Sequence, residues 1–249
     1  LSEANNAATY GKPNKWMAEA LLVKLYINWA VYTCGDVTTY EAATATNTKL
    51  NDCVKYCDDI INSGLFNLED AYCEKFLYDN GVHISDFIYA MPYYGGSMKN
   101  SCAGIVAMNP EFASLFSLED DDRNNAVLGG KVFVHDPLSG EATDEPYMYK
   151  GEQLEFTKEI TLKAGGEEQL NAGADANGWR QGWRSIKFYP NPSEYSLYSR
   201  NQSNDVPIFR YADILLTKAE AILRGAEATN GDTPQLLFNQ IRSYVNAPL

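Results

Sequence analysis

The sequence carries little positive charge for its length. Its 249 residues include 20 Lys and Arg against 33 Asp and Glu, so the formal net charge at pH 7 is −13. The phosphate backbone of nucleic acids and anionic membrane surfaces repel a chain of this charge. We therefore expect no nucleic-acid partner and no direct electrostatic attachment to a membrane.

Long apolar runs are also missing. The longest candidate, residues 18–31, is interrupted by Glu19, Lys24 and Asn28, whereas a membrane-spanning helix needs about 20 predominantly apolar residues. No signal peptide opens the chain and Leu1 is not an initiator Met, so we expect a mature form or a fragment.

Metal-binding and catalytic motifs are scarce. The chain has two His and five Cys, and it contains no C-x-x-C pair, although a zinc site needs about four such ligands. Cys53 and Cys57 lie four residues apart on a predicted helix, which favours small apolar residues on a buried face over a metal site. The sequence has no G-x-S-x-G, P-loop or G-x-G-x-x-G motif, so no motif supports catalysis.

Apolar and aromatic side chains, by contrast, are plentiful. Hydrophobic residues make up 45% of the chain and include 17 Tyr, 10 Phe and 4 Trp, enough for a sizeable core. Residues 16–33 and 50–61 have apolar positions at helical spacing and predict two helices, joined by a Thr-, Ala- and Asn-rich loop. The first segment has two neighbouring apolar stripes, so we expect it to be sandwiched between other helices.

The same plan recurs near the C-terminus. Residues 207–224 predict a helix that begins at Pro207 and ends before Gly225, and a second helix begins at Pro234 with Thr233 as its N-cap. The apolar positions of the first of these helices are Ile208, Tyr211, Ala212, Leu215, Leu216, Ala219, Ile222 and Leu223. Helix pairs of this size are typical of tetratricopeptide-type units, which bury their apolar faces by stacking.

The residues between the two pairs are dense in Gly, Pro, Asn and Asp, and their apolar runs are short. We predict strands at 87–91, 131–135, 155–162 and 185–189 and a short helix at 110–116. The fold class is therefore mainly α. Tetratricopeptide-like helix pairs at 12–64 and 204–246 form a scaffold, and a long loop-rich excursion at 65–203 contains a few short β-strands. We treat 1–249 as one domain and expect ligand binding in the excursion, because function concentrates on long loops carried by a rigid scaffold.

A glycan site needs exposed aromatic rings, on which pyranose faces stack, and planar polar side chains for the hydroxyls. The first candidate is MPYYGGSMKN at 91–100. Its Gly95-Gly96 pair favours a tight turn that presents Tyr93 and Tyr94, with Lys99 and Asn100 in reach of hydroxyls. The alternative is that one of these Tyr side chains packs beneath the loop.

A second candidate is NGWRQGW at 177–183. Trp179 lies in a Gly-flanked loop with Arg180 beside it, which suits stacking and hydroxyl recognition, whereas we expect Trp183 to be structural. Tyr147 and Tyr149 form a third, weaker candidate.

We interpret two charged features as structural: the acidic run at 119–122 and the charged residues of the helix predicted at 207–224. The run at 119–122 offers four carboxylates to a cation such as calcium, but it lacks the spaced D-x-D-x-D-G pattern, which favours a solvated helix end, and we expect no cofactor. In the helix predicted at 207–224, we expect Arg210 to pair with Asp205 or Asp213, and Glu220 to contact a neighbouring helix.

Six segments of the sequence, taken together in their order along the chain, resemble the segments of a known family. They are GKPNKWMAEALLVKLYINWAVYT (11–33), LNDCVKYCDDIINSGLFNL (50–68), DFIYAMPYYG (86–95), NPEFASLFSLEDDDR (109–123), GWRSIKFYP (182–190) and NDVPIFRYADILLTKAEAILRG (204–225). Together they resemble the SusD/RagB family of glycan-binding outer-membrane lipoproteins of Bacteroidetes. The last is similar to that family's Asp-x-Pro-x-x-Arg-Tyr-Ala-Asp-x-Leu-Leu-x-x-Ala-Glu-Ala segment.

The resemblance implies a cell-surface, lipid-anchored protein whose anchor cysteine lies outside this sequence. It implies that the protein binds an oligosaccharide or polysaccharide without catalysis and delivers it to a TonB-dependent SusC-like transporter. The family's loop after the 87–91 strand often contributes to the glycan platform, which supports the candidate at 91–100. Two other functions stay open: a helical-repeat scaffold for proteins or peptides, and a glycoside hydrolase, whose two carboxylates could be any of the 33 present.

Overall fold

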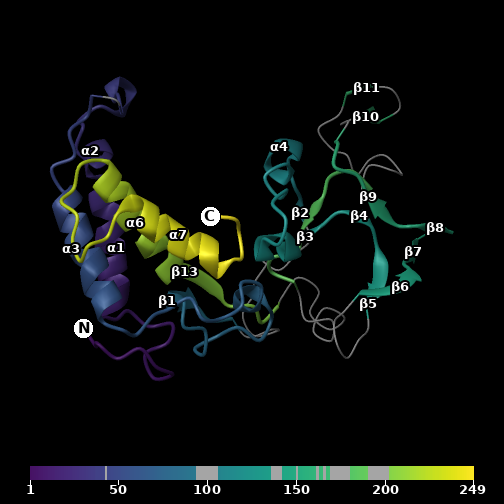
Figure 1. The fold of residues 1–249 in the computed structure, drawn as a ribbon, viewed down its shortest axis with the longest axis horizontal. Helices are drawn as coiled ribbons and strands as arrows, with labels where there is room; N and C mark the ends of the chain where they lie inside the picture. The colour runs from purple at the N-terminus through teal and green to yellow at the C-terminus, as the bar shows by residue number, and fades with distance from the viewer. Residues whose placement is uncertain are drawn as a thin grey trace.

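The fold divides into a helical layer and a strand-rich part (Figure 1). A computed structural model describes residues 1–42, 44–93, 106–135, 142–149, 151–160, 163–164, 167–168, 180–189 and 202–249. The helical layer draws on both ends of the chain, and the strand-rich part contains the middle of the chain.

The helical layer stacks its helices in one continuous series. It contains α1 (Lys15–Ile27), α2 (Trp29–Tyr32), α3 (Leu50–Asn62), α6 (Tyr211–Leu223) and α7 (Pro234–Tyr244). α1 packs on α3, α3 on α6, and α6 on α7. Helices from the two ends of the sequence therefore meet at the α3–α6 contact, as tetratricopeptide-type stacking predicts.

Local sequence sets the helix ends. Asn14 caps α1, its side chain accepting a hydrogen bond from Met17 N at 2.9 Å, and the predicted N-cap Thr233 is confirmed by its bond from Leu236 N. The helix predicted at 16–33 is interrupted at Asn28, because Nδ2 of Asn47 donates hydrogen bonds to the carbonyl oxygens of Tyr26 and Ile27 at 2.8 and 3.0 Å. Side chains that bond helix-end carbonyls in this way satisfy groups that the helix leaves unpaired.

The main core lies between α1, α3 and α6. Its buried members are Trp16, Ala20, Val23, Ile27, Cys53, Val54, Cys57, Ile60, Phe66, Ile88, Ile214, Ala221 and Ala226. Burial of one such large aliphatic side chain contributes about 1.5–3 kcal/mol, so this cluster dominates the stability of the layer. The interpretation of Cys53 and Cys57 as small core residues is confirmed, since both are fully buried.

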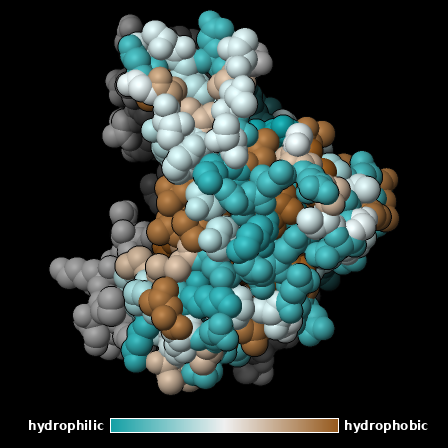
Figure 2. Space-filling model, turned by 90° about the vertical axis from the view of Figure 1, so that its left-hand side faces the viewer, coloured by the Kyte–Doolittle hydropathy of each residue, from teal (hydrophilic) through white to brown (hydrophobic). Residues whose placement is uncertain are grey.

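The second apolar stripe of α1 is not covered, so the prediction that this helix is sandwiched is wrong. On this stripe Leu21 of α1 and Tyr32 of α2 are 44% and 62% exposed, although α3, α6 and β1 pack against α1. Figure 2 shows the end of the molecule that carries these helices, where hydrophilic residues predominate and hydrophobic residues form separate groups.

The helix predicted from Pro207 begins four residues later. Residues Val206–Arg210 form β13, which pairs antiparallel with β1 (Phe87–Met91). The pairing sets Ala90 opposite Pro207, and Pro207 is tolerated because a two-stranded sheet has an open edge for a residue without an N–H. α6 then starts where Tyr211 N and Ala212 N donate to the backbone and side-chain oxygens of Asp86, at 2.8 and 3.0 Å.

The strand-rich part consists of short antiparallel pieces. Its strands are β2 (Val106–Ala107), β3 (Val127–Leu128), β4 (Gly130–Lys131), β5 (Phe133–His135), β6 (Ala142–Pro146), β7 (Met148–Tyr149), β8 (Glu152–Gln153), β9 (Glu155–Phe156), β10 (Lys163–Ala164), β11 (Glu167–Glu168) and β12 (Arg184–Ser185). β2, β12 and β3 form a three-stranded sheet, and the described strands otherwise pair two by two.

Several of the elements predicted for this part are shorter in the structure. The strand predicted at 131–135 divides into β4 and β5 around Val132, whose N–H donates to Leu154 O at 2.8 Å. The helix predicted at 110–116 is confirmed only as α4 (Pro110–Ala113), capped by Asn109 as expected. Single-turn helices complete the described fold at Val37–Thr39, Glu74–Phe76 and Asp122–Ala126.

Candidate functional site

The structure places two of the six candidate glycan contacts. Tyr93 and Arg180 lie within the described residues, whereas Tyr94, Lys99, Asn100 and Trp179 lie outside them. The two described residues belong to different segments, one directly after β1 and one before β12. They therefore mark where each candidate loop is attached to the fold.

Tyr93 is held by its backbone. The residue is half-buried, and its N–H donates to Oδ1 of Asp205 at 2.7 Å. Asp205 immediately precedes β13, the strand that pairs with β1. The position of Tyr93 thus depends on a carboxylate that lies 112 residues away in the sequence.

Asp205 is the centre of a buried polar cluster. Its Oδ2 accepts a hydrogen bond from the Tyr10 hydroxyl at 2.6 Å, and its backbone N–H donates to Asn80 Oδ1 at 2.7 Å. Asn80 in turn donates to the carbonyls of Asp205 and Lys75 at 3.0 and 2.7 Å. Burial raises the pKa of Asp205, and the bonds from Tyr10 and Tyr93 oppose that rise.

Arg210 does not pair with either predicted carboxylate. Its Nη1 lies 3.0 Å from Oδ2 of Asp86, and Nζ of Lys75 lies 3.0 Å from the same oxygen. Lys75 and Asp86 have fully buried side chains, and Lys75 Nζ also lies 4.3 Å from the ring centroid of Tyr244. Sequence periodicity could not find this triad, because Asp86 and Arg210 are 124 residues apart.

The partners of Asp213 and Glu220 also differ from the prediction. Asp213 pairs with Lys24 of α1 at 2.5 Å. The Glu220 carboxylate pairs with Arg224 on its own helix at 2.9 Å, so the predicted contact with a neighbouring helix is wrong. It is Arg224 that reaches α1, where its Nη1 donates to Ile27 O at 2.9 Å.

The second candidate stretch is anchored through Arg180 and Trp183. Arg180 Nη1 lies 3.0 Å from Oε2 of Glu152, whose side chain is exposed. The indole of Trp183 covers Gly129 so closely that a Cβ added at Gly129 would lie 2.5 Å from the ring. This contact supports a structural role for Trp183.

The third candidate is described only in part. Tyr147 is 47% exposed beside β7, so its ring is open to a ligand, and the Tyr149 side chain lies outside the description.

Two carboxylates of the acidic run at 119–122 have hydrogen-bond partners, one local and one near the C-terminus. Asp121 accepts from Arg123 N at 2.9 Å and pairs with the guanidinium of Arg123, which lowers the pKa of Asp121. Asp122 accepts a hydrogen bond from Asn246 Nδ2 at 2.9 Å. Across the part of the chain that the structure describes, no three His, Cys, Asp or Glu residues are grouped to hold a metal ion.

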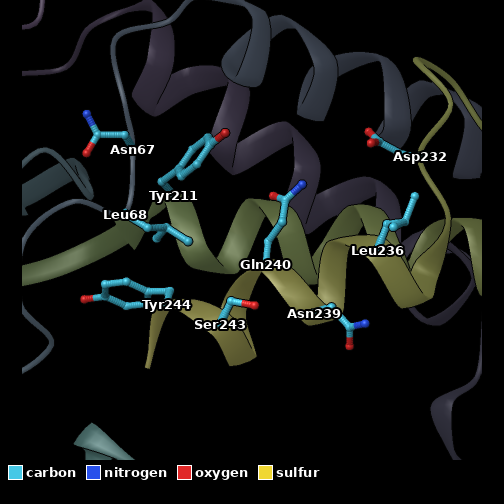
Figure 3. A pocket seen from close by; sticks show the side chains of 9 residues that line it. All are labelled: Asn67, Leu68, Tyr211, Asp232, Leu236, Asn239, Gln240, Ser243 and Tyr244. Atoms are coloured by element: carbon cyan, nitrogen blue, oxygen red, sulfur yellow. The ribbon is translucent and has the colours of Figure 1, made fainter. Parts of the chain in front are cut away.

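A groove on the helical layer was not predicted. It has a volume of about 730 Å³ and is lined by Asn67, Leu68, Tyr211, Asp232, Leu236, Asn239, Gln240, Ser243 and Tyr244. Figure 3 shows these side chains on α7, at the start of α6, on the segment that carries Leu68 and, for Asp232, on the loop before α7. Asp232 is held by the buried ammonium of Lys218, which lies 2.5 Å from both Asp232 and Asp58. The groove therefore presents aromatic, carboxamide and hydroxyl groups together with one carboxylate that is ion-paired with Lys218.

Neither Tyr93 nor Arg180, the two candidate residues that the structure describes, lines this groove. The sequence offered only a weak signal for it, namely polar Asn239, Gln240 and Ser243 among the apolar positions of α7.

Comparison with known proteins assigns the family. Residues 38–248 match SusD_RagB, the SusD family. The chain belongs to the SusD family. The starch-binding protein SusD of Bacteroides thetaiotaomicron is 23% identical in an alignment 274 positions long, which covers 96% of this chain and 46% of that protein. The chain thus spans about half the length of this relative.

Solved structures confirm the fold. Surface glycan-binding protein A from Bacteroides uniformis superposes with a TM-score of 0.58 at 16% identity, covering all of this chain and 46% of that one. A structure solved with a xylogluco-oligosaccharide superposes with a TM-score of 0.55 at 20% identity, again over all of this chain and 46% of the other. The helical scaffold with short strands is therefore a SusD-like fold.

Proposed function

We propose that this protein is a non-catalytic, cell-surface glycan-binding protein that captures oligosaccharide and delivers it to a SusC-like TonB-dependent transporter. The observation that carries the proposal is family membership over residues 38–248. A relative aligned with 96% of the chain is a starch-binding protein. The structure solved with a xylogluco-oligosaccharide has the same fold, which supports an oligosaccharide as the ligand class.

The net charge of the chain restricts the class of glycan that we expect as ligand. A net charge of −13 repels acidic ligands at long range. Aromatic rings and uncharged polar groups bind neutral sugars without that penalty. We therefore infer a neutral glycan rather than a uronate-rich or sulfated one.

We place the glycan site in the excursion at 65–203 of this single SusD-like domain. The contacts are Tyr93, Tyr94, Lys99 and Asn100 after β1, together with Trp179 and Arg180. Support comes from the backbone anchor of Tyr93 on Asp205 and from Arg180, which holds the second segment to the outer strands through Glu152. Binding in this proposal needs no cofactor, and equal affinity in EDTA and in calcium is the expected result.

The location follows from the family. We propose that a lipid anchor outside this sequence holds the protein on the outer membrane. Of the helices that the structure describes, none has the length and apolarity needed to cross a bilayer.

A glycan array probed with the purified protein tests the proposal. We expect binding to one class of neutral glycan, confirmed by isothermal titration. The heat-unfolded protein is the control for non-specific adsorption. Binding to no glycan in either assay would contradict the proposal.

Catalysis is tested on the same glycans. We expect no release of reducing ends after prolonged incubation with a bound glycan, because the six proposed contacts include neither of the two carboxylates that glycoside hydrolysis needs. Release that is lost on heat denaturation would instead favour a glycoside hydrolase.

A second candidate function has an observation of its own. The groove between α6 and α7 offers the carboxamides of Asn239 and Gln240 beside Tyr211, and carboxamides can pair with the backbone of an extended peptide. A peptide array that gives binding sensitive to Gln240→Ala, with no response on the glycan array, would favour a helical-repeat peptide binder.

A further inference from the structure

Three segments that are distant in the sequence meet at the side chain and backbone of Asp205. Tyr10 comes from the N-terminal segment, Asn80 from the loop before β1, and Tyr93 from the residues just after β1. Each makes a hydrogen bond of 2.7 Å or less to Asp205. Only 6% of Asp205 is exposed, so water does not compete effectively for these bonds.

The two carboxylate oxygens have separate partners. Oδ1 accepts from the backbone of Tyr93 and Oδ2 accepts from the hydroxyl of Tyr10. Among the described residues, no Lys or Arg lies within ion-pair distance of Asp205. A buried carboxylate normally has a cationic partner, because its desolvation is costly. In Asp205, hydrogen bonds from the Tyr93 N–H and the Tyr10 hydroxyl stand in for a cationic partner.

The N-terminal segment also contacts the residue before Tyr93. Gly11 has a φ of +69°, and a Cβ at Gly11 would lie 2.6 Å from Cδ of Pro92. Only glycine permits this backbone conformation without strain together with this close approach. Tyr10 and Gly11 therefore both restrain the residues that follow β1. Tyr10 acts through Asp205, and Gly11 acts through its close approach to Pro92.

We propose that Asp205, supported by Tyr10, is a positioning residue of the glycan site. It fixes the backbone of Tyr93 and thereby sets the direction in which the Tyr93 ring leaves β1. This inference rests on the proposed function for its glycan readout. The backbone restraint at Tyr93 can be measured without any ligand.

Hydrogen exchange at the Tyr93 amide tests the restraint directly. We expect Asp205→Ala to speed exchange of that amide at least tenfold and to weaken glycan binding about tenfold, with exchange in α3 unchanged. Asp205→Asn keeps an acceptor for the Tyr93 N–H and an amide that can pair with the Tyr10 hydroxyl, so it should restore both readouts to near wild type. Tyr10→Phe removes one of the two bonds and should give a smaller change in the same direction.

The matched control is Asp36→Ala. The Asp36 side chain also accepts a backbone N–H, from Thr38 at 2.9 Å, but in an exposed turn away from β1. This variant should leave Tyr93 exchange and glycan affinity unchanged.

Separate outcomes overturn the two ideas. Wild-type exchange at Tyr93 in Asp205→Ala overturns the positioning role, and so does an Asp205→Asn variant as impaired as Asp205→Ala. Wild-type protein that binds no glycan overturns the proposed function while leaving the exchange result standing. If Asp205→Ala does not fold, Tyr10→Phe and Asp205→Asn test the positioning role instead, through hydrogen exchange at the Tyr93 amide and through glycan affinity.

Discussion

The helical layer and the strand-rich excursion are held together by different means. α1, α3 and α6 are each 13 residues long and enclose a buried apolar cluster. Most described strands of the excursion are only two residues long and pair in twos, and isolated two-stranded pieces are marginally stable. Apolar packing therefore supplies most of the contacts that hold the scaffold helices together, whereas the excursion depends more on specific polar contacts at its base.

Those contacts are concentrated where the two regions join. Lys75, Asp86 and Arg210 form a buried charge triad, and Asn80 and Asp205 form a neighbouring hydrogen-bonded pair. Both groups link the residues around β1 to those around β13. Buried polar groups of this kind favour a single arrangement, because any other arrangement leaves a charge or a donor unpaired.

The largest effect is expected from Asp86→Ala. The substitution leaves Lys75 without its counter-ion in a fully buried site and removes the acceptor for Ala212 N at the start of α6. We expect the free energy of unfolding to fall by about 3–5 kcal/mol, measured by urea denaturation. Asp213→Ala breaks a partly exposed pair with Lys24 and should cost no more than about 1 kcal/mol. Equal losses for the two variants would contradict this account.

Two matched valines compare the regions directly. Val23 is fully buried in the helical core, and Val132 is half-buried between β4 and β5. Val23→Ala should lower the free energy of unfolding by about 2 kcal/mol, from about 0.8 kcal/mol per buried methylene-sized group plus a cavity cost. Val132→Ala should cost less than half as much in the same denaturation experiment. A larger loss at Val132 than at Val23 would contradict the dependence of the scaffold on apolar packing.

Arg210→Ala tests whether the residue is architectural. The Arg210 side chain is 25% exposed and still leaves Asp86 with Lys75, so we expect a loss of about 1–3 kcal/mol and a lower melting temperature. Glycan affinity measured well below that temperature should stay within about twofold of wild type. An unchanged melting temperature with binding abolished would assign Arg210 to the ligand site instead.

The smallest effect concerns pH. Burial, and next the charge of Arg210, lower the pKa of Lys187 to about 8, and its ammonium lies 4.1 Å from the ring centroid of Phe76. Between pH 8 and the usual lysine pKa of about 10.4, the unfolded chain binds more protons than the folded one, so stability rises with pH. Lys187→Met should lose this rise in urea denaturation at pH 7.5 and 9.5. Identical pH profiles for the two proteins would contradict the expectation.

The sequence was most informative where structure is local. Periodicity predicted α3, and capping residues predicted the starts of α7 and α4, because each depends on neighbours within one or two turns. The same reasoning failed at residues 207–210. There the chain pairs with β1 and forms a strand, and helical spacing alone could not reveal this non-local pairing. The partner of Arg210 and the anchor of Tyr93 were missed for the same reason.

Exposure was the second limit. The stripe through Leu21 and Tyr32 has the spacing of a buried face, yet these two side chains are exposed, since spacing does not say whether a partner is present. For the candidate site, composition indicated the loops, and the structure shows how Tyr93 and Arg180 are attached. The remaining four residues stay predictions.

The most direct test of the central claim is titration of the preferred neutral glycan into wild type, Tyr93→Ala, Tyr94→Ala, Trp179→Ala and Tyr32→Ala. Tyr32 is an exposed aromatic residue on the helical layer, so it controls for the loss of a surface ring. We predict that at least one of the three excursion variants binds tenfold or more weakly, a loss of about 1.4 kcal/mol, while Tyr32→Ala binds as wild type. Unchanged affinity in all three excursion variants would contradict the account.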